Sequence, residues 1–339
     1  MKIAVLGLGF MGSTHLKAYK KIPQVELAAV ASDIPQALTG DLSHIQGNIG
    51  GPGEKMDFSG LGRYADPFEA IKHPGVEAVD ICLPTNLHAP VAIAALRAGK
   101  HVLVEKPMAL TAADCDAVLA AAKDSGRVLM SAQVCRFLPA YAATARMVKS
   151  GELGQVRSAI LRRRCAAPPW SVWLDKKDMS GGGVFDLLIH DIDFCIHLFG
   201  LPEAVSAVGY ENLKAGIDWV TAELFYPEIG GVVVSGGWHH PKAFPFSMEY
   251  SVLGDCGTVE FSSAAGEPPT LYSSAGEKKP LEVGDADGYQ AEIEYFVDCC
   301  VNGKRPEFCP PEESAAAVKL ARLIDEGRNK KGEKIECSL

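Results

Sequence analysis

Four ionisable residues lie at helical spacing in the apolar segment 181–200 and would share a stripe about 60° wide on a helix: Asp186, His190, Asp193 and His197. Leu, Ile, Phe and Cys fill most of the other positions, so such a helix would be buried on most sides. A histidine exchanges a proton near neutral pH, and a carboxylate one turn away can fix its tautomer or hydrogen-bond a substrate hydroxyl. The stripe is typical either of a cleft wall that performs acid–base chemistry or of a buried helix whose polar residues meet protein partners.

Lys106 is a second candidate for chemistry. It ends the apolar run 101–105 and precedes Pro107, which restricts its backbone to an extended or turn conformation. A lysine at a strand end is usually a solvated surface charge. At a ligand-binding edge, however, it could stabilise a developing alkoxide or tune a nearby histidine.

The elements that would position these groups begin at the N-terminus. Residues 2–6 are apolar, a Gly-x-Gly-x-x-Gly sequence follows at once, and a helical pattern runs on to residue 19. This setting is that of a dinucleotide-binding turn, in which the glycines allow a tight turn, close approach of a pyrophosphate and close helix packing. The helix N-terminus would face the phosphates. We therefore expect cofactor contacts from the turn residues Gly7, Gly9, Phe10, Met11 and Gly12.

The end of the second predicted strand, 26–31, bears on the choice of cofactor. An acidic side chain at this point commonly binds the adenine ribose. Asp33 in that place would favour NAD, whereas Ser32 would leave room for a 2′-phosphate. No arginine close by in the sequence is evident to bind that phosphate, so the sequence favours NAD over NADP.

Strands and helices alternate through the first part of the chain, with strands at 78–83, 101–104 and 128–131 and helices at 91–98 and 112–123. Alternation predicts a doubly wound parallel sheet, here a Rossmann domain over residues 1–132. The glycine-rich stretch 40–63 reads as a loose connection within it. Ligands lie beyond the carboxyl ends of such strands. This rule adds further cofactor-rim residues: Leu83, Pro84, Thr85, Asn86, His88, Glu105, Lys106 and Pro107.

The second part of the chain, 133–339, has a different pattern. Short strand-like runs separated by turns predict mostly antiparallel pairing, and helices are expected at 140–150, 291–300 and 314–329. We expect an α+β domain with a mostly antiparallel sheet. The tryptophans of the loop 168–173, Trp170 and Trp173, could stack on a sugar or nicotinamide or could simply pack.

Composition excludes several classes of function. A chain of 339 residues predicts two domains, and a net charge of −9 provides no footprint for nucleic acid or an anionic membrane. No uncharged apolar stretch reaches membrane-spanning length. The ten cysteines form no CxxC pair, and His239-His240 lacks a third ligand at usable spacing, so we expect no metal site. Scattered cysteines favour a reducing, cytoplasmic location.

With these motifs in place, the chain resembles the glucose–fructose oxidoreductase and inositol dehydrogenase family, known as Gfo/Idh/MocA, over nearly its full length. Five motifs carry the resemblance in order and spacing: Gly7-x-Gly9-x-x-Gly12-x-x-His15, Pro84-Thr85-x-x-His88, Glu105-Lys106-Pro107, Arg136-Phe137-x-Pro139 and Gly181-Gly182-Gly183-x-x-Asp186-x-x-x-His190-x-x-Asp193. The resemblance implies NAD(P)-linked redox chemistry on sugars, inositols and related polyols. It also implies a nucleotide domain, an open antiparallel sheet and assembly into homodimers or homotetramers through that sheet.

The resemblance also assigns roles to residues. It implies that Lys106, Asp186 and His190 are catalytic. Contacts to substrate are expected from Gln133, Arg136, Trp173 and Asp193. The family's acidic residue after the second strand aligns best with Ser32 and not with Asp33, which is a departure that bears on the choice between NAD and NADP.

Two other functions fit parts of this pattern. One is a glycoside hydrolase that uses tightly held NAD for transient oxidation, a chemistry that some relatives show. The other is a non-catalytic dinucleotide sensor, against which the intact set of Lys106, Asp186 and His190 argues.

Overall fold

The computed structural model describes residues 1–47, 53–169, 171 and 173–338. Trp170 and part of the glycine-rich stretch 40–63 lie outside the described residues. The chain forms two compact units, the first made of residues 1–134 and 287–315 and the second of residues 135–286 and 316–339.

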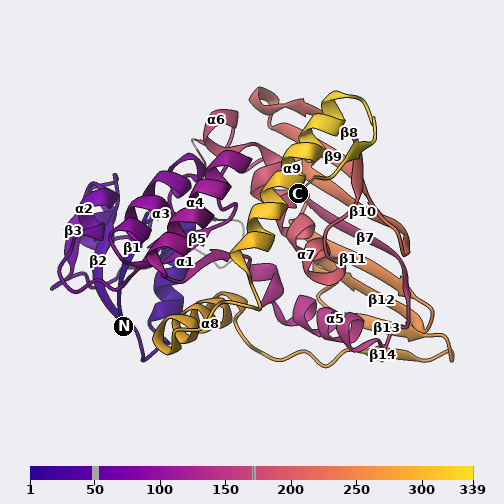
Figure 1. Ribbon diagram of the computed structural model, residues 1–339, viewed down its shortest axis with the longest axis horizontal. Helices are drawn as coiled ribbons and strands as arrows, with labels where there is room; N and C mark the ends of the chain where they lie inside the picture. The colour runs from indigo at the N-terminus through magenta and orange to yellow at the C-terminus, as the bar shows by residue number, and fades with distance from the viewer. Residues whose placement is uncertain (48–52, 170, 172, 339) are drawn as a thin grey trace. The chain divides into compact units, whose positions relative to one another are not determined.

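A six-stranded parallel sheet forms the centre of the first unit, with the strand order β3-β2-β1-β4-β5-β6 (Figure 1). This order, which runs outward in both directions from β1, is that of a dinucleotide-binding sheet and confirms the predicted doubly wound fold. The strands are β1 (Lys2–Leu6), β2 (Glu26–Ala31), β3 (Gly62–Tyr64), β4 (Ala78–Ile81), β5 (His101–Glu105) and β6 (Leu129–Ala132). Between β2 and β3, an isolated antiparallel bridge joins Asp41 to Lys55 within the glycine-rich stretch.

Helices accompany this sheet: α1 (Phe10–Tyr19), α2 (Pro67–Ile71), α3 (His88–Arg97), α4 (Ala112–Ser125) and α8 (Gly288–Asn302). Their ends follow ordinary capping chemistry, since the Thr111 side chain accepts the Asp114 N–H at the start of α4 and left-handed Gly126 ends it. Helix α8 packs against α1. Residues 287–315, which the sequence analysis places with the second domain, therefore lie in the first unit. An amphipathic pattern shows that a helix will be buried but not which sheet it will cover.

The second unit is built on a nine-stranded sheet with the order β14-β13-β12-β11-β7-β10-β9-β8-β15. All its strand pairs are antiparallel except β7 with β10, as expected from the sequence. The strands are β7 (Val156–Cys165), β8 (Ala204–Asn212), β9 (Ile217–Tyr226), β10 (Ile229–Trp238), β11 (Ser247–Gly254), β12 (Gly257–Ser262), β13 (Thr270–Ser273), β14 (Lys278–Pro280) and β15 (Ile335–Glu336).

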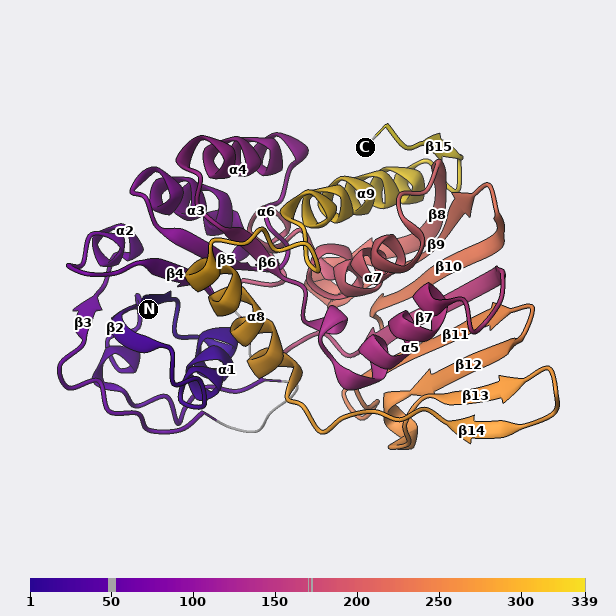
Figure 2. The ribbon, with the colours of Figure 1, turned by 60° about the horizontal axis from the view of Figure 1, so that its bottom comes forward.

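Three helices, α5 (Pro139–Ser150), α7 (Ile189–Phe199) and α9 (Pro311–Asn329), lie along one face of this sheet (Figure 2). Inward-facing aromatic side chains join the two layers. The Tyr141 ring of α5 packs edge-on against Phe194 of α7 and Tyr250 of β11, at centroid distances of 4.8 and 5.1 Å. A short helix, α6 (Lys177–Ser180), and a π-helical turn, Val184–Leu188, lead into α7. Single 3₁₀ turns occupy Ala37–Thr39, Thr85–Leu87, Val134–Arg136, Leu213–Ala215 and Ser263–Ala265.

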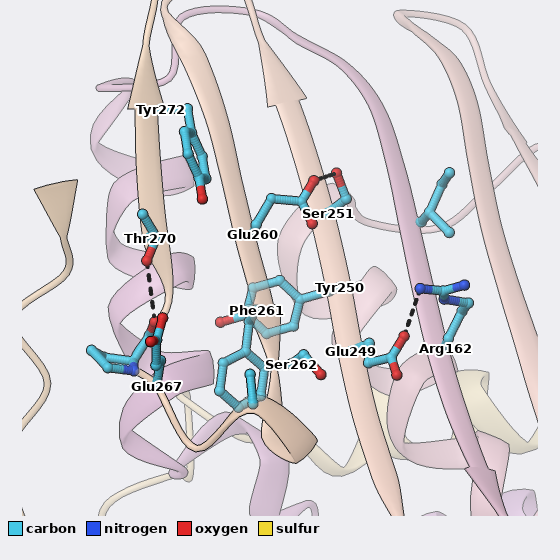
Figure 3. A pocket seen from close by; sticks show the side chains of 13 residues that line it. Arg162, Glu249, Tyr250, Ser251, Glu260, Phe261, Ser262, Glu267, Thr270 and Tyr272 are labelled. Atoms are coloured by element: carbon cyan, nitrogen blue, oxygen red, sulfur yellow. Dashed lines mark hydrogen bonds and ion pairs between the residues drawn. The ribbon is translucent and has the colours of Figure 1, made fainter. Parts of the chain in front are cut away.

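The opposite face of the nine-stranded sheet carries apolar side chains that reach solvent. The strand registers place five of them on this one face, each 42–58% exposed: Ile160, Val208, Tyr210, Leu253 and Tyr272. An open pocket of about 480 Å³ crosses strands β7, β11, β12 and β13 beside an ion pair between Arg162 and Glu249 (Figure 3). We call this exposed surface the open sheet face.

Among the residues that the structure describes, no helix combines the length and the apolar character that crossing a lipid bilayer requires.

Candidate active site

The glycine turn after β1 has the shape that a pyrophosphate requires. Gly7 has a φ of +99°, and a Cβ atom on it would lie 2.3 Å from the carbonyl oxygen of Cys82. A Cβ on Gly12 would lie 1.9 Å from the carbonyl oxygen of Gly7. A Cβ on Gly9, by contrast, would meet no described atom within 4 Å. Two glycines are thus required by packing, and the space above Gly9 lies open at the N-terminus of α1, where first-turn N–H groups bind anions.

The neighbouring residues Phe10 and Met11 begin α1 and are partly exposed. The residues of this turn therefore fit the cofactor contacts predicted for them, because they combine open space, a helix N-terminus and accessible side chains.

The two candidates for ribose binding at the end of β2 differ in their exposure to solvent. Ser32 is buried, and its hydroxyl accepts the N–H of Ile34 at 3.1 Å, whereas Asp33 is exposed. The sheet also pairs Val30 with Arg63 of β3. An arginine therefore lies on the adjacent strand, which the sequence analysis missed because Arg63 is distant in sequence.

The turn after β4 contributes Leu83, Pro84, Thr85 and Asn86, of which Asn86 is exposed and Thr85 buried. His88 is also buried, with Nε2 lying 2.8 Å from the carbonyl oxygen of Leu83 and Nδ1 lying 2.7 Å from that of Pro107. Both ring nitrogens are thus used to join the segments that follow β4 and β5. The contact to cofactor that was expected of His88 stays a prediction, and the structure gives the ring two backbone partners instead.

Lys106 follows the last residue of β5 and is partly exposed, while Glu105 and Pro107 on either side of it are buried. The Lys106–Pro107 peptide bond is cis. A carboxylate oxygen of Glu105, Oε2, accepts the backbone N–H of Lys106 at 3.0 Å. The backbone N–H of Lys106 is therefore fixed by a buried carboxylate, while the lysine side chain remains partly accessible.

A buried polar network lies behind this turn and was not foreseen. His15 lies between Asp80, at 2.8 Å from Nδ1, and Glu105, at 3.2 Å from Nε2. Asp80 also accepts a hydrogen bond of 3.0 Å from the Tyr19 hydroxyl. The available signal was an acid inside the apolar strand 78–81, because strands of a parallel sheet are normally apolar throughout.

His15, Asp80 and Cys82 place their potential ligand atoms within 4.8 Å of one another. Two ligand atoms of a tetrahedral zinc ion lie about 3.3 Å apart. The 2.8 Å separation of His15 Nδ1 and Asp80 Oδ2 is shorter and is that of a direct hydrogen bond. Burial also raises the pKa of Cys82, which keeps the thiol protonated. The geometry is that of a hydrogen-bonded network.

In the second unit, three glycines bring the chain to the π-helical turn. Gly182 has a φ of +85°, and a Cβ on it would lie 2.4 Å from a carboxylate oxygen of Asp218. The same oxygen accepts the Gly183 N–H at 2.6 Å, and the other oxygen pairs with Arg328. Asp218 therefore fixes the turn before Asp186. The sequence does not reveal this role of Asp218, because its partner Gly183 is 35 residues away.

Asp186 and His190 differ in accessibility from the residues around them. All residues from 181 to 197 are described, and these two are partly exposed while the other fifteen are buried. Asp186 lies near Cys165 at the end of β7, where burial and the charge of Asp186 raise the pKa of the thiol to about 12. The predicted acid and base thus share the accessible side of an otherwise buried segment.

Asp193, which the sequence places on the same stripe, has a different environment. Its two carboxylate oxygens accept hydrogen bonds of 2.6 and 2.8 Å from Arg136, and neither side chain is exposed. Asp191, on the next face, pairs in the same way with Arg163 of β7. Substrate contacts of Arg136 and Asp193 stay a prediction, and the structure assigns each to the other as partner.

The remaining substrate candidates are Gln133 and Trp173. Gln133 is buried just after β6, and within the described part of the chain neither its amide oxygen nor its nitrogen has a hydrogen-bond partner. Trp173 is partly buried and packs against a cluster of Cys165, Leu174, Leu187 and Trp238. The structure thus describes packing for Trp173 and leaves the Gln133 amide available to a ligand.

Comparison with known proteins matches both halves of the chain. Residues 1–133 match the family described as oxidoreductase family, NAD-binding Rossmann fold, and residues 141–260 match the GFO/IDH/MocA C-terminal domain. The chain is 32% identical over 336 residues to myo-inositol 2-dehydrogenase of Thermotoga maritima, which covers 96% of this chain and 94% of the relative. It is 27% identical over 319 residues to scyllo-inositol 2-dehydrogenase (NAD(+)) of Bacillus subtilis, covering 90% and 88%.

A solved structure of levoglucosan dehydrogenase in complex with NADH and levoglucosan has the same fold. Its TM-score is 0.85 at 21% sequence identity, with 100% of both chains covered.

Proposed function

Because this chain belongs to the Gfo/Idh/MocA family of oxidoreductases, we propose that it transfers a hydride between a nicotinamide cofactor and a secondary hydroxyl group of a sugar, inositol or related polyol. The inositol and levoglucosan dehydrogenases to which it is similar support this class of substrate. The observation that carries the proposal is the accessibility of Asp186 and His190 within a buried segment. An acid–base pair in this setting suits the removal of a hydroxyl proton.

Cofactor binding is assigned to the first unit. The open space at Gly9 and the N-terminus of α1 would hold the pyrophosphate, and the exposed Asp33 would bind the adenine ribose. An acid in this place supports NAD as the cofactor. The residues at the ends of β4 and β5, among them Asn86 and Lys106, would line the nicotinamide side. When bound, the nicotinamide accepts or donates the hydride.

Each chemical role falls to a named group. His190 takes the hydroxyl proton in the oxidation and returns it in the reverse direction. Asp186 fixes the tautomer of His190 or binds a neighbouring hydroxyl of the substrate. Lys106 stabilises negative charge that develops on the substrate oxygen. Gln133 supplies an amide to a substrate hydroxyl, and the pair of Arg136 and Asp193 braces α7 behind the chemistry.

A screen of inositols, aldoses and aldonic acids with NAD and with NADP, followed by the absorbance of the reduced nicotinamide, tests the function. Stoichiometric reduction of NAD by at least one of these compounds is expected. Turnover of glycosides without net formation of NADH would instead identify a redox-assisted glycoside hydrolase. Tight dinucleotide binding with no turnover of any of the compounds would identify a sensor.

The open sheet face is the part of the second unit to which we assign self-association, as a homodimer or homotetramer. Its five exposed apolar side chains, with Val208 and Tyr210 on β8, support a protein partner. Light scattering on the Val208→Glu variant should show dissociation. Val301→Glu, which changes an exposed valine of α8 in the first unit, is the matched control and should leave the assembly unchanged. An unchanged assembly in Val208→Glu would contradict the proposal.

We place the protein in the cytoplasm. The structure describes all ten cysteines and joins none of them in a disulfide, which supports a reducing compartment. Fractionation of cells that express the full chain tests this assignment.

A further inference from the structure

The turn that carries Lys106 is in contact with a set of buried polar residues to which the proposed reaction assigns no role. Glu105 ends β5, and its Oε2 atom accepts the backbone N–H of Lys106 at 3.0 Å. This carboxylate is almost inaccessible to solvent. A residue that fixes the Glu105 carboxylate therefore also fixes the backbone of Lys106.

His15 contacts the other oxygen of this carboxylate. Nε2 of His15 lies 3.2 Å from Oε1 of Glu105, and Nδ1 lies 2.8 Å from Oδ2 of Asp80. Asp80 is in β4, the strand that pairs with β5, and it is fixed further by the Tyr19 hydroxyl at 3.0 Å. The imidazole thus hydrogen-bonds Asp80 of β4 and lies at ion-pair distance from Glu105 of the adjacent strand, although its Nε2 makes no hydrogen bond in the described part of the chain.

The charge of His15 suits this position. Burial is the largest single influence and lowers the pKa of His15, but the charges and hydrogen bonds of Asp80 and Cys82 together outweigh it and raise the pKa well above its usual value. A protonated ring has an N–H on each nitrogen, whereas a neutral ring has only one. Protonated His15 therefore places a positive charge beside Asp80 and Glu105, which are both buried.

His15 also connects these carboxylates to the nucleotide turn. It lies in α1, which begins directly after Gly9. The same helix therefore presents its N-terminus to the pyrophosphate site and its His15 side chain to the end of β5. A shift of α1 would be passed through one imidazole to Glu105 and on to the backbone of Lys106.

We propose that His15 is a positioning residue that acts through Glu105 to hold Lys106 in place relative to the nucleotide turn. The inference rests on the proposed catalytic role of Lys106. A purely structural His15 would contribute to the stability of the first unit and would leave the environment of Lys106 unchanged in any variant that folds.

Three variants of the full chain separate these roles. His15→Leu removes both ring nitrogens, and His15→Gln retains an amide that can donate to one carboxylate. His101→Gln is the matched control, because His101 lies at the opposite end of β5, where its Nδ1 accepts the Val128 N–H at 3.0 Å. If His15→Leu fails to fold, His15→Gln still carries the test.

Kinetics provide the first readout. His15→Gln should lower kcat by about 10–100-fold while KM and the Kd for NADH stay within about threefold of the wild type, because the lysine is displaced and the binding groups are not. His101→Gln should leave kcat unchanged. The double variant His15→Gln/Lys106→Ala should be no slower than Lys106→Ala alone. Additive losses in the double variant, or an unchanged kcat in His15→Gln, would overturn the proposal.

A second readout does not depend on turnover. Reductive methylation with carbon-13 gives each lysine an NMR signal, and the Lys106 signal is assigned by its loss in Lys106→Arg. We expect His15→Gln to shift this signal and its titration, and His101→Gln to leave both unchanged. An unshifted signal in folded His15→Gln would overturn the positioning role.

The two proposals fail in different ways. If the wild type oxidises no polyol, the proposed function fails and the NMR arm still tests the positioning of Lys106. If Lys106→Ala retains turnover, the catalytic role of the lysine fails whatever the His15 variants do. The remaining alternative is a metal site that includes His15, and metal analysis of the purified wild type tests it. A stoichiometric metal that is lost in His15→Gln would overturn the proposal.

Discussion

The guanidinium of Arg136 and the carboxylate of Asp193 meet through two hydrogen bonds, of 2.6 and 2.8 Å, with neither side chain exposed to solvent. Arg136 lies in the 3₁₀ turn Val134–Arg136 and Asp193 lies in the middle of α7. The pair therefore ties α7, which follows directly after the turn that carries Asp186, to the first residues of the second unit.

Breaking this pair from one side should be costly, because the other charge would be left buried. Arg136→Met is expected to lower the free energy of unfolding by about 3–5 kcal/mol, measured from urea unfolding of the second unit. Arg157→Met removes a bidentate pair of similar geometry with Asp255 that is half exposed, and it should cost much less, because solvent screens the pair and hydrates the remaining charge. Equal losses in the two variants would contradict the assignment of a buried brace. The double variant Arg136→Met/Asp193→Leu should recover part of the loss.

Two glycines of the nucleotide turn should differ in their effects on folding and on NADH binding. Gly9→Ala should fold as the wild type does, because its Cβ meets no described atom within 4 Å, but it should weaken NADH binding by occupying the space assigned to the pyrophosphate. Gly12→Ala should lower the unfolding temperature as well, because its Cβ would lie 1.9 Å from a backbone oxygen. Fluorescence titration with NADH and thermal unfolding together check both. Normal NADH affinity in Gly9→Ala would place the pyrophosphate elsewhere.

Asp33 should decide the cofactor preference. We expect the wild type to use NAD with a higher kcat/KM than NADP. Asp33→Ser should lower kcat/KM for NAD by roughly 10- to 100-fold, since a hydrogen bond to a charged acceptor contributes roughly 1.5–3 kcal/mol. The same change should raise activity with NADP, because it removes repulsion between a carboxylate and the 2′-phosphate. Initial rates with each cofactor provide the measurement. A wild type that prefers NADP would contradict this prediction and would favour Arg63 on β3 as the ligand of the 2′-phosphate.

Removing the proposed base should affect turnover and spare the cofactor. His190→Ala is expected to lower kcat by at least about 100-fold, with NADH affinity unchanged. Asp186→Asn should cause a smaller loss, because the amide can still hydrogen-bond the imidazole or a hydroxyl. Steady-state rates at several pH values and NADH titration check both variants. Retention of full activity by His190→Ala would exclude it as the base.

The lowered pKa of His197 should make the free energy of unfolding depend on pH. Burial, together with the positive charges of Arg136 and Lys149, lowers its pKa from 6.5 to about 3. Its neutral ring lies 3.0 Å from the Lys149 ammonium, which can donate to it. Below a pH of about 6.5 the unfolded chain binds a proton that the folded chain does not, so stability should fall from there down to about pH 3. His197→Asn should reduce this slope between about pH 6.5 and pH 4 in urea unfolding. Identical slopes would contradict the lowered pKa.

Much of the fold could be predicted because local patterns determine it. The glycine turn, the alternation of strands and helices, and the rule that ligands lie beyond strand ends are sufficient to place Lys106 at the edge of a parallel sheet next to the nucleotide turn. The antiparallel character of the second sheet followed from its short strands. These inferences use residues that are close together in the sequence.

What could not be predicted depends on distant partners. Helical periodicity places Asp186, His190 and Asp193 at similar angles, but it does not show that Asp193 meets Arg136 and is buried. The contacts of His15 with Asp80 and Glu105 join three separate elements, and only the unexpected acid in β4 hinted at them. The return of α8 to the first unit is a matter of topology, which no local pattern specifies.

The π-helical turn at Val184–Leu188 has a consequence for chain length. A π turn contains one residue more than an α turn. Deleting a single residue between Asp186 and His190 would allow the turn to become α-helical, and the two residues, then three positions apart, would still be neighbours on the helix surface. The anchors of α7 through Arg136 and Arg163 would be untouched. A loss of one residue at this turn would thus leave the two groups side by side, without altering the chemistry of any side chain.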